Sequence, residues 1–258
     1  WHDIGADMDS SVFGFVVRDD DLFIGGSFNT AGGESIRRIV RYNISSGTWH
    51  SLGNVLSGTV RALAFSGENL YVGGDFWPIS SKQLRSIARY DLNTGSWHSL
   101  GYGLYGMVSS LSVIGDNLYL GGRFTQADGK VVNNVARYNL TDESWHAVGE
   151  GVNDFVITLA VSEDDLFLGG SFTLAGSTEA LRVARYDLET ETQQSVASGL
   201  GNAVSHPIHA MAVKGDDIFI VGEFTHIGGK PFNHIARYNK PTDSWHSLGN
   251  GVNGDVFD

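Results

Sequence analysis

An internal repeat of about 48 residues constrains the fold of this chain more than any other feature. The first residues of successive units are Trp1, Trp49, Trp97, Trp145, Gln193 and Trp245. The first four steps are 48 residues each, and the last is 52 because of four extra residues near positions 202–207. A period in this range is typical of solenoids and propellers, where one unit cannot bury its apolar surface alone. The chain is therefore expected to stack several copies of one small element.

Each unit predicts four short strands. In the second unit an apolar run at 60–65 is followed by a turn and by a second run that ends in a Gly pair at 73–74. The third strand is expected at 87–91 and, after an Asn-Thr-Gly turn, the fourth at 97–100. Turn residues between short apolar runs are a hairpin signal, and no helical period is present. We expect an all-β fold, a closed five-bladed β-propeller of four-stranded antiparallel blades.

The repeat also predicts the domain organisation. We expect one domain over 1–258, with repeats at 1–48, 49–96, 97–144, 145–192 and 193–244 and a partial repeat at 245–258. The partial repeat has the phase of residues 1–14, so the pattern holds one more fourth strand than five blades need. Either residues 1–5 or the Trp245 strand closes the ring, and the other strand is left unpaired. An unpaired edge favours a head-to-tail homo-oligomer or filament, with a monomer as the alternative.

Three residue types recur at fixed positions in the units. The glycine positions are filled by the pairs 25–26, 73–74, 121–122 and 169–170, with Val221-Gly222 as a degenerate fifth copy. The tyrosine position of the third strand is filled by Tyr42, Tyr90, Tyr138, Tyr186 and Tyr238. With the tryptophan of the fourth strand, this pattern resembles the kelch and galactose-oxidase-like propeller repeat. It is even more similar to long extracellular repeat proteins, including the fungal cell-polarity markers.

This resemblance implies a secreted or cell-surface protein. It does not imply galactose-oxidase chemistry, because that copper centre depends on a tyrosine cross-linked to a cysteine and the chain has no cysteine. No nucleophile elbow, metalloprotease motif or unique acidic pair breaks the repeat pattern. We expect no enzyme activity, no catalytic residue and no cofactor.

The charge balance restricts the partners. The chain has 17 Lys and Arg residues against 29 Asp and Glu residues, a formal net charge of −12. Such a field repels phosphate backbones and anionic lipids, so we expect no nucleic acid partner. No apolar run is long enough to cross a bilayer, which argues against membrane insertion. The partners expected are other copies of the chain, surface proteins or glycans.

Four repeated features could carry a site, and each has a structural alternative. The Gly pairs could cradle a phosphate, but no helix follows them, so close backbone approach is favoured. The histidines of the Trp-His pairs could bind metal, but at the rim of a propeller symmetric copies lie far apart. The acidic turns at 19–21, 163–165 and 216–217 could bind calcium, although tight turns select the same residues. We therefore expect no metal site.

The fourth feature is an arginine in every third strand. The set is Arg41, Arg89, Arg137, Arg185 and Arg237. We interpret these as struts between blades that pair with a carboxylate or carbonyl group, and a five-fold sugar or anion site is the alternative. The largest departure from the repeat, around His206, Pro207 and His209, is interpreted as a longer loop.

Two sequons predict N-glycosylation. Asn43 and Asn139 each begin an Asn-X-Ser/Thr motif at the end of a third strand. Their identical phase predicts that both lie on one exposed edge.

The first functional hypothesis is a non-enzymatic extracellular structural or adhesive module. The alternative is a multivalent lectin with one shallow site per blade, and a hydrolase or lyase acting in the central channel ranks below both.

Overall fold

The structure, a computed structural model, describes residues 8–77, 84–196 and 204–257. These residues form β-strands joined by turns, with no helix among them. Five antiparallel sheets follow one another along the chain, and we number them sheets 1 to 5. Each takes its first strands from one repeat and its fourth strand from the start of the next unit. The all-β propeller architecture is confirmed.

The sheets consist of the following strands. Sheet 1 has β1 (Val12–Arg18), β2 (Asp21–Gly26), β3 (Ile39–Asn43) and β4 (Thr48–Ser51). Sheet 2 has β5 (Thr59–Ser66), β6 (Asn69–Asp75), β7 (Ile87–Asp91) and β8 (Ser96–His98). Sheet 3 has β9 (Leu104–Ile114), β10 (Asn117–Ala127), β11 (Lys130–Val131), β12 (Val135–Asn139) and β13 (Trp145–Ala147). Sheet 4 has β14 (Val156–Ser162), β15 (Asp165–Gly170), β18 (Val183–Asp187) and β19 (Thr192–Ser195), with the hairpin β16 (Leu174–Ala175) and β17 (Thr178–Glu179) beside it. Sheet 5 has β20 (Ile208–Lys214), β21 (Asp217–Gly222), β24 (Ile235–Asn239) and β25 (Ser244–Ser247), with the hairpin β22 (His226–Ile227) and β23 (Lys230–Pro231).

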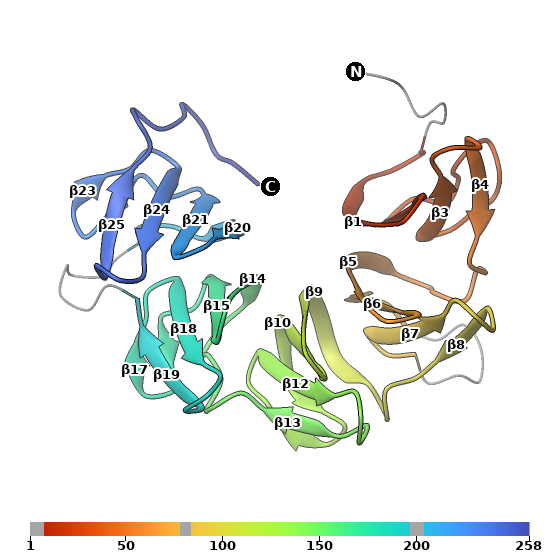
Figure 1. Cartoon of the computed structure of the whole chain (residues 1–258), viewed down its shortest axis with the longest axis horizontal. Coiled ribbons are helices and arrows are strands. Elements are labelled where there is room, and N and C mark those ends of the chain that lie inside the picture. The colour runs from red at the N-terminus through yellow and green to blue at the C-terminus, as the bar shows by residue number, and fades with distance from the viewer. Residues whose placement is uncertain (1–7, 78–83, 197–203, 258) are drawn as a thin grey trace.

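The first strand of every sheet lies on the inside of an arc and the fourth strand on its outer rim (Figure 1). Neighbouring first strands pack together in chain order, β1 on β5, β5 on β9, β9 on β14 and β14 on β20. The arc stays open between β20 and β1 (Figure 1). The expected closure of the ring is therefore wrong. The inner strands were predicted to begin near Val12, Val60, Val108, Val156 and Ile208, and all but β9, which begins at Leu104, do so to within one residue.

A valine or isoleucine at the start of each later first strand packs against a glycine of the preceding sheet. A Cβ atom built on Gly25 would lie 2.4 Å from Val60 Cγ1, and one on Gly121 would lie 2.6 Å from Val156 Cγ1. The corresponding distances are 2.6 Å for Gly73 and Val108 and 2.9 Å for Gly169 and Ile208. Any side chain at these glycines would displace the neighbouring sheet, which explains the first residue of the Gly pair.

The second glycine of each pair has a different role. A Cβ atom on Gly74 would lie 2.1 Å from the carbonyl oxygen of Thr59, and one on Gly122 would lie 2.0 Å from that of Met107. Both carbonyl groups belong to the same sheet as the glycine. The expected close approach is thus confirmed, with one glycine serving the seam between sheets and the other serving the hairpin within a sheet.

A β-bulge near the start of each first strand orients the side chains of the seam. In sheet 2 the bulge lies between Val60 and Ala62. Val60 and Phe65 are five residues apart, so in a regular strand they would face opposite sides. The bulge puts them on the same side, where Val60 meets Gly25 and the ring of Phe65 lies 5.1 Å from that of Phe23.

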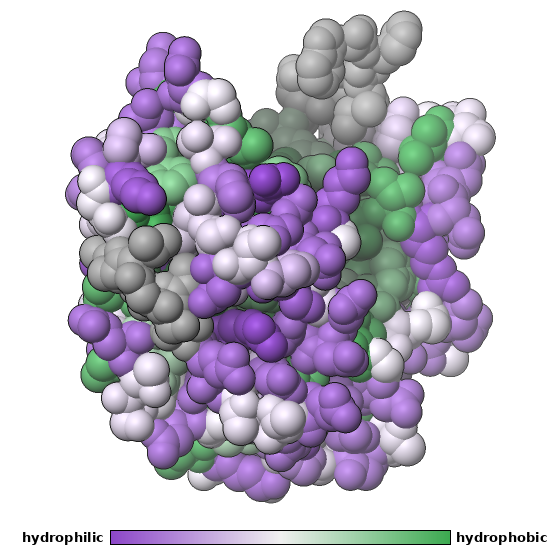
Figure 2. Space-filling view, turned by 60° about the vertical axis from the view of Figure 1, so that its left-hand side comes forward, coloured by the Kyte–Doolittle hydropathy of each residue, from purple (hydrophilic) through white to green (hydrophobic). Residues whose placement is uncertain are grey.

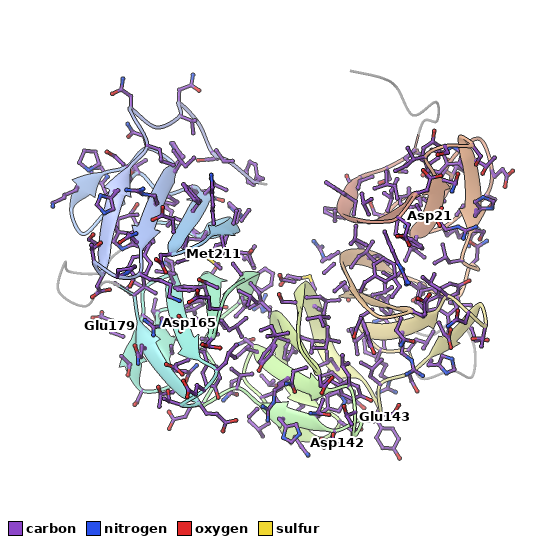
Figure 3. All side chains as sticks on the ribbon, viewed as in Figure 1. Asp21, Asp142, Glu143, Asp165, Glu179 and Met211 are labelled. Carbon is purple, nitrogen blue, oxygen red and sulfur yellow. The ribbon has the colours of Figure 1, made fainter. Side chains whose placement is uncertain are left out.

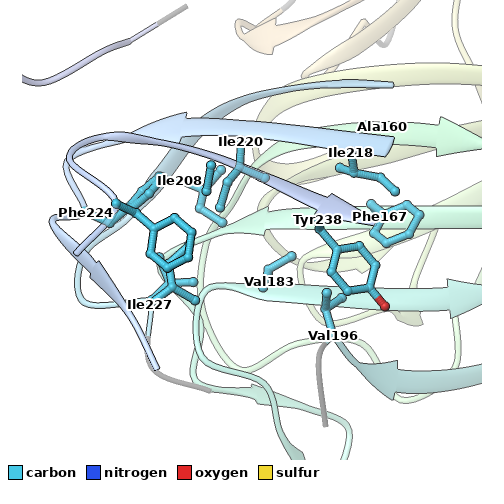
Figure 4. Packing of buried hydrophobic residues seen from close by; sticks show 13 residues of the cluster. Ala160, Phe167, Val183, Val196, Ile208, Ile218, Ile220, Phe224, Ile227 and Tyr238 are labelled. Carbon is cyan, nitrogen blue, oxygen red and sulfur yellow. The ribbon is translucent and has the colours of Figure 1, made fainter. Parts of the chain in front are cut away.

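The hydrophobic core is divided into clusters that lie at the seams and inside the sheets. At the seam of sheets 4 and 5, Phe167 and Val183 of sheet 4 pack with Ile208, Ile220 and Tyr238 of sheet 5 (Figure 4). The phenylalanine after each Gly pair is buried in all five units, and a short hairpin or bridge follows it in four of them, whereas only a loop was expected. A single repeat is not enough for a stable fold, because both faces of its sheet are buried only by neighbouring sheets.

The fourth strand of sheet 5 shows which end of the chain completes the last sheet. Trp245 pairs with Tyr238 across β24 and β25, so this strand completes sheet 5. The alternative in which residues 1–5 close the last blade and the Trp245 strand pairs elsewhere is therefore wrong. Residues 1–5 themselves lie outside the described part of the chain.

Candidate functional site

A central cavity lies on the inside of the arc. Its volume is about 640 Å³, and the first strands of all five sheets contribute to its lining. Most of the lining side chains are apolar, including Phe15 and Met211, and Met211 lies at the inner side of sheet 5 in Figure 3. The polar members of the lining are Arg61, Ser109, Ser110, Thr158 and His209.

The serine hydroxyl groups of the cavity hold the sheets together. Ser109 Oγ lies 3.0 Å from the carbonyl oxygen of Gly121 and 2.5 Å from that of Val156 in the next sheet. Ser110 Oγ accepts a hydrogen bond from the amide of Leu159, also in the next sheet, at 3.1 Å. Both hydroxyls are therefore engaged with backbone groups, as buried polar atoms must be.

The arginine and the histidine of the lining also have partners. The guanidinium carbon of Arg61 lies 4.9 Å from the centre of the Phe13 ring, a cation–π contact. His209 Nε2 lies 2.9 Å from Glu223 Oε1, and its ring lies 4.9 Å from that of Phe257. No carboxylate belongs to the described lining of the cavity, so those residues provide no pair of acids for general acid and base catalysis.

The acidic turns do not converge on a common point. Asp21, Asp142, Glu143, Asp165 and Glu179 are spread over sheets 1, 3 and 4 (Figure 3). Within the described residues, no group of three or more His, Asp or Glu side chains has an arrangement suited to a metal ion. In the turn at 19–21, Asp20 accepts hydrogen bonds from the amide and hydroxyl of Ser45, at 3.2 and 2.8 Å. This agrees with the turn chemistry favoured by the sequence.

The repeated arginines pair with carboxylates, but only two of them connect sheets. Arg89 reaches Glu143 of sheet 3 at 3.9 Å, and Arg137 reaches Glu191 of sheet 4 at 3.6 Å. The other three contact an aspartate of their own sheet: Arg41 with Asp21, Arg185 with Asp165, and Arg237 with Asp217. The interpretation as struts between blades therefore applies to two positions, and all five guanidinium groups have a carboxylate within 4 Å.

At the seam of sheets 4 and 5, a lysine rather than one of the repeated arginines forms the ion pair between sheets. Lys240 Nζ lies 2.8 Å from Asp165 Oδ2, and Asp165 also accepts from Arg185 Nε at 2.6 Å. The Asp165 side chain is almost fully buried, and a buried carboxylate with two cationic partners is well compensated. This seam thus combines the apolar cluster of Figure 4 with a charged link.

Burial at the seams also changes the titration of tyrosines. Desolvation raises the pKa values of Tyr71 and Tyr119, and it raises the pKa of Tyr138 to about 12, with a smaller contribution from Glu143. These phenol groups stay neutral over the physiological range. They act as packing groups of the seams rather than as acids.

The histidines of the Trp-His pairs lie on the outer strands. His50, His146 and His246 each contact a hydroxyl group two residues earlier in the chain, at 2.9, 2.7 and 3.0 Å. Each belongs to a different sheet, so these imidazoles do not share a site. His209 is the one His from the predicted insertion with a defined role in the cavity, and part of that insertion, 202–203, lies outside the described residues.

Both sequon asparagines are the last residues of third strands. Asn43 Nδ2 donates to Asp21 Oδ1 at 3.0 Å, and its Oδ1 accepts from the amide of Ser46. Asn139 Oδ1 accepts from the amides of Thr141 and Asp142, at 2.9 and 3.0 Å. The two side chains are half-buried and organise the following turn. Glycosylation at these positions stays a prediction.

A second surface collects aromatic side chains at the seam of sheets 2 and 3. Trp77, Tyr102 and Tyr105 are each more than half exposed. The guanidinium carbon of Arg85 lies 5.7 Å from the centre of the Trp77 ring and 4.9 Å from that of Tyr105, and Arg85 also donates to the Tyr105 hydroxyl. We call Trp77, Arg85 and Tyr105, which these contacts join, the aromatic platform. Aromatic faces with adjacent donors are typical of recognition surfaces.

Sequence comparison decides the family. The model of the Rax2 C-terminal beta propeller domain matches residues 5–117 and 66–155, which together cover more than half of the chain. The chain belongs to this family. A second model, a beta-propeller domain of unknown function, matches residues 216–240 of sheet 5. Both matches support a β-propeller repeat for this Rax2-family chain, and the kelch-type likeness stays a resemblance.

Solved structures similar to this Rax2-family chain share its fold. The extracellular domain of the one-component system BT4673 of B. thetaiotaomicron is 14% identical, with a TM-score of 0.63, and the match covers 95% of the chain. A second structure, described as the extracellular domain of the hybrid two-component system BT4673, is 15% identical with a TM-score of 0.64. In both, the chain spans 29% of the length of the relative. The computationally designed Ika8 protein is 13% identical with a TM-score of 0.53 over 76% of its length.

Two further findings concern curated protein sequences and membrane-spanning helices. No curated protein sequence gives a significant match. In the described ranges, no helix is long and apolar enough to cross a membrane.

Sequence reasoning missed the aromatic platform. Its signal was present, because Trp77 stands where the other units have Asn29, Thr125, Thr173 and Thr225. Likewise, Tyr105 stands where the neighbouring units have Ser57 and Asn153. Departures from the repeat toward large exposed side chains would have identified this surface.

Proposed function

We propose that this chain is a non-enzymatic extracellular module with a structural or adhesive role. The proposal rests on the polar groups of the central cavity, which are bonded to other groups of the protein. Ser109 and Ser110 join neighbouring sheets, Arg61 stacks on Phe13, and His209 pairs with Glu223. A cavity whose polar groups stabilise the scaffold suits a rigid platform.

An extracellular location is supported by two independent observations. The similar solved structures from BT4673 are described as extracellular domains. The sequons at Asn43 and Asn139 are suited to a protein that passes through a glycosylating compartment.

The location can be tested on intact cells that produce the full-length protein. A protease added outside the cells should release fragments of the propeller, and an antibody against it should label unpermeabilised cells. Labelling only after permeabilisation would refute the extracellular role. A cytosolic marker protein serves as the control for cell integrity.

The adhesive role has its own test. Beads coated with the purified chain should bind to cells of the same source more than beads coated with the heat-unfolded chain. The comparison is repeated with Tyr102→Ser and Tyr105→Ser, because these exposed side chains are candidates for the contact. Equal binding of folded and unfolded coatings would contradict adhesion by the propeller.

The aromatic platform favours a second candidate function, carbohydrate binding. Sugar rings stack on exposed aromatic side chains, and Arg85 can donate to their hydroxyl groups. The platform is confined to the seam of sheets 2 and 3, so this candidate has one site instead of one site per blade. On a glycan array the chain should bind a defined set of glycans. Tyr105→Ala should abolish that binding, and Trp77→Ala should weaken it, whereas Ile44→Ala, an exposed apolar change on sheet 1, should leave it unchanged.

A further inference from the structure

Each sheet has two different faces at the seams. The leading face carries the valine or isoleucine at the start of the first strand, and the trailing face carries the glycine that receives it. The seams of sheets 1 to 5 join the trailing face of one sheet to the leading face of the next. The leading face of sheet 1 and the trailing face of sheet 5 are the two that border the gap in the arc (Figure 1).

The leading face of sheet 1 is apolar and uncovered. Val12 is 45% exposed, whereas the residues at its position in the other sheets, Val60, Val108, Val156 and Ile208, are fully buried. Phe15 and Val17 on the same strand are 67% and 55% exposed. Hydrophobic atoms line the recess between the two ends of the arc (Figure 2). A sheet face of this composition is normally covered by another sheet.

The trailing face of sheet 5 does not fit Val12. Position 221 is valine, whereas the corresponding residues of the other sheets are Gly25, Gly73, Gly121 and Gly169. At those glycines the space of a Cβ atom is taken by the incoming valine or isoleucine, at 2.4 to 2.9 Å. Val256, which has the phase of Val12, lies beside this face, and its amide is 3.4 Å from the carbonyl oxygen of Gly222. The place that Val12 would need for direct closure of sheet 5 on sheet 1 is therefore taken by the residue that follows sheet 5.

Residues after sheet 5 occupy part of its trailing side instead. The amide of Val256 donates to the carbonyl oxygen of Gly222 at 3.4 Å, and Asp255 lies 3.3 Å from His234. The ring of Phe257 lies 4.9 Å from that of His209. Phe257 has the phase of Phe13, but Phe13 contacts Arg61 of the following sheet, at 4.9 Å, whereas Phe257 contacts a residue of the preceding sheet.

The path of these residues matches the connections between earlier sheets. The amide of Val252 donates to the carbonyl of Asn233 at 3.0 Å, as the amide of Val152 donates to that of Asn133 at 2.9 Å. Asn233 Nδ2 binds the carbonyl of Asn250 at 2.8 Å, as Asn133 Nδ2 binds that of Glu150 at 3.0 Å. At the earlier junction this path leads from sheet 3 into the first strand of sheet 4.

We propose that the gap is the docking site of a sixth sheet of the same repeat. Its first strand continues from Val256 and Phe257, and its glycine pair receives Val12 and covers Phe15 and Val17. Two observations select this occupant: the match of the tail contacts to those at the junction of sheets 3 and 4, and the need for a glycine opposite Val12. A second copy of the chain fits less well, because its residues 255 and 256 already occupy part of the trailing side that it would offer.

The test uses the absence of cysteine from the chain. Phe15→Cys places a single thiol on the uncovered face, and Leu63→Cys places one at the same position of sheet 2, at a seam that is already covered. The chain is compared with a version lengthened after Asp258 by a copy of residues 111–148, which in register supplies the rest of a sixth sheet with its glycine pair. A matched version carries valine in place of the first glycine in the copy.

Maleimide labelling of Phe15→Cys should be fast in the 258-residue chain and at least about tenfold slower in the lengthened chain. The slowing should be lost when the copied glycine is valine, and Leu63→Cys should label slowly in all three. Equal labelling of the lengthened chain and the 258-residue chain would overturn the proposal. So would slow labelling in the 258-residue chain, either at all concentrations, which indicates closure on sheet 5, or only at high concentration, which indicates a second copy.

Discussion

The valine of each seam and its equivalent in sheet 1 give a matched pair of substitutions. Val156→Ala removes two carbon atoms from a fully buried side chain that lies against Gly121. At about 0.8 kcal/mol for each buried carbon group the transfer loss is about 1.6 kcal/mol, and the cavity left behind adds roughly 1 kcal/mol. Val12→Ala makes the same change at a position that is 45% exposed, so its cost should be within about 0.5 kcal/mol.

Both variants can be compared by urea unfolding and by thermal melting. Val156→Ala should lower the free energy of unfolding by about 2 to 3 kcal/mol with an unchanged m-value, which corresponds to a fall in Tm of roughly 5 to 10 °C. Gly121→Ala should also destabilise, by about 1 to 3 kcal/mol, because the added methyl group meets Val156. The double variant should be more stable than the sum of the two losses predicts, since one change makes room for the other. Equal losses at Val12 and Val156 would refute the reasoning from the glycine seam.

The structure supports further predictions on stability and modification. Trp97→Ala should cost about 3 to 5 kcal/mol in unfolding free energy, because the ring is buried and its Nε1 donates to a carbonyl of sheet 1 at 2.7 Å; an unchanged melting curve would contradict this. Gln193→Trp should restore the aromatic pair of the other sheets and raise stability by about 1 kcal/mol, whereas a lower Tm would show that the seam has no room for the ring. Hydrogen bonds from backbone amides, that of Thr94 first, lower the pKa of Asp91, so its stabilisation is present above the ordinary Asp value and is lost as the pH falls below about 4. Asp91→Asn keeps the acceptor oxygen, and its Tm should decline less than that of the wild type between pH 5 and pH 3; identical profiles would exclude this contribution. Peptide mass spectrometry of material from a eukaryotic host should find hexose-containing glycans on Asn43 and Asn139, and two unmodified peptides would refute that prediction.

Much of the fold was predictable because the repeat appears in the local chemistry of the chain. Turn residues, apolar runs and the Gly pairs located the first strands. The recurring tyrosine and tryptophan, identified as fixed positions of the repeat, contact each other across neighbouring strands, as in Tyr90 with Trp97 at 5.0 Å. The Gly pair was correctly interpreted as a packing feature. The sequence does not show that one glycine serves the seam and the other the hairpin, because both positions have the same residue type and differ only in their neighbours in three dimensions.

Closure of the ring could not be derived from counting strands. It depends on how far one sheet turns relative to the next, and on whether the last trailing face accepts the first leading face. The valine at 221 was visible in the sequence as a degenerate copy, but its consequence depends on which glycine of the pair meets a neighbour. The partners of the repeated arginines were equally hidden, since Arg89 bonds across a seam and Arg185 within its own sheet through carboxylates at different positions.

The glycine and valine of the seams make the order of the sheets directional. Every sheet has a projecting residue on one side and a vacant position on the other, so a unit inserted in the same orientation provides both contacts that its neighbours require. Tandem duplication of a repeat therefore creates new seams without any compensating substitution. Gain or loss of whole units therefore gives this architecture a simple route by which related chains can differ in their number of repeats.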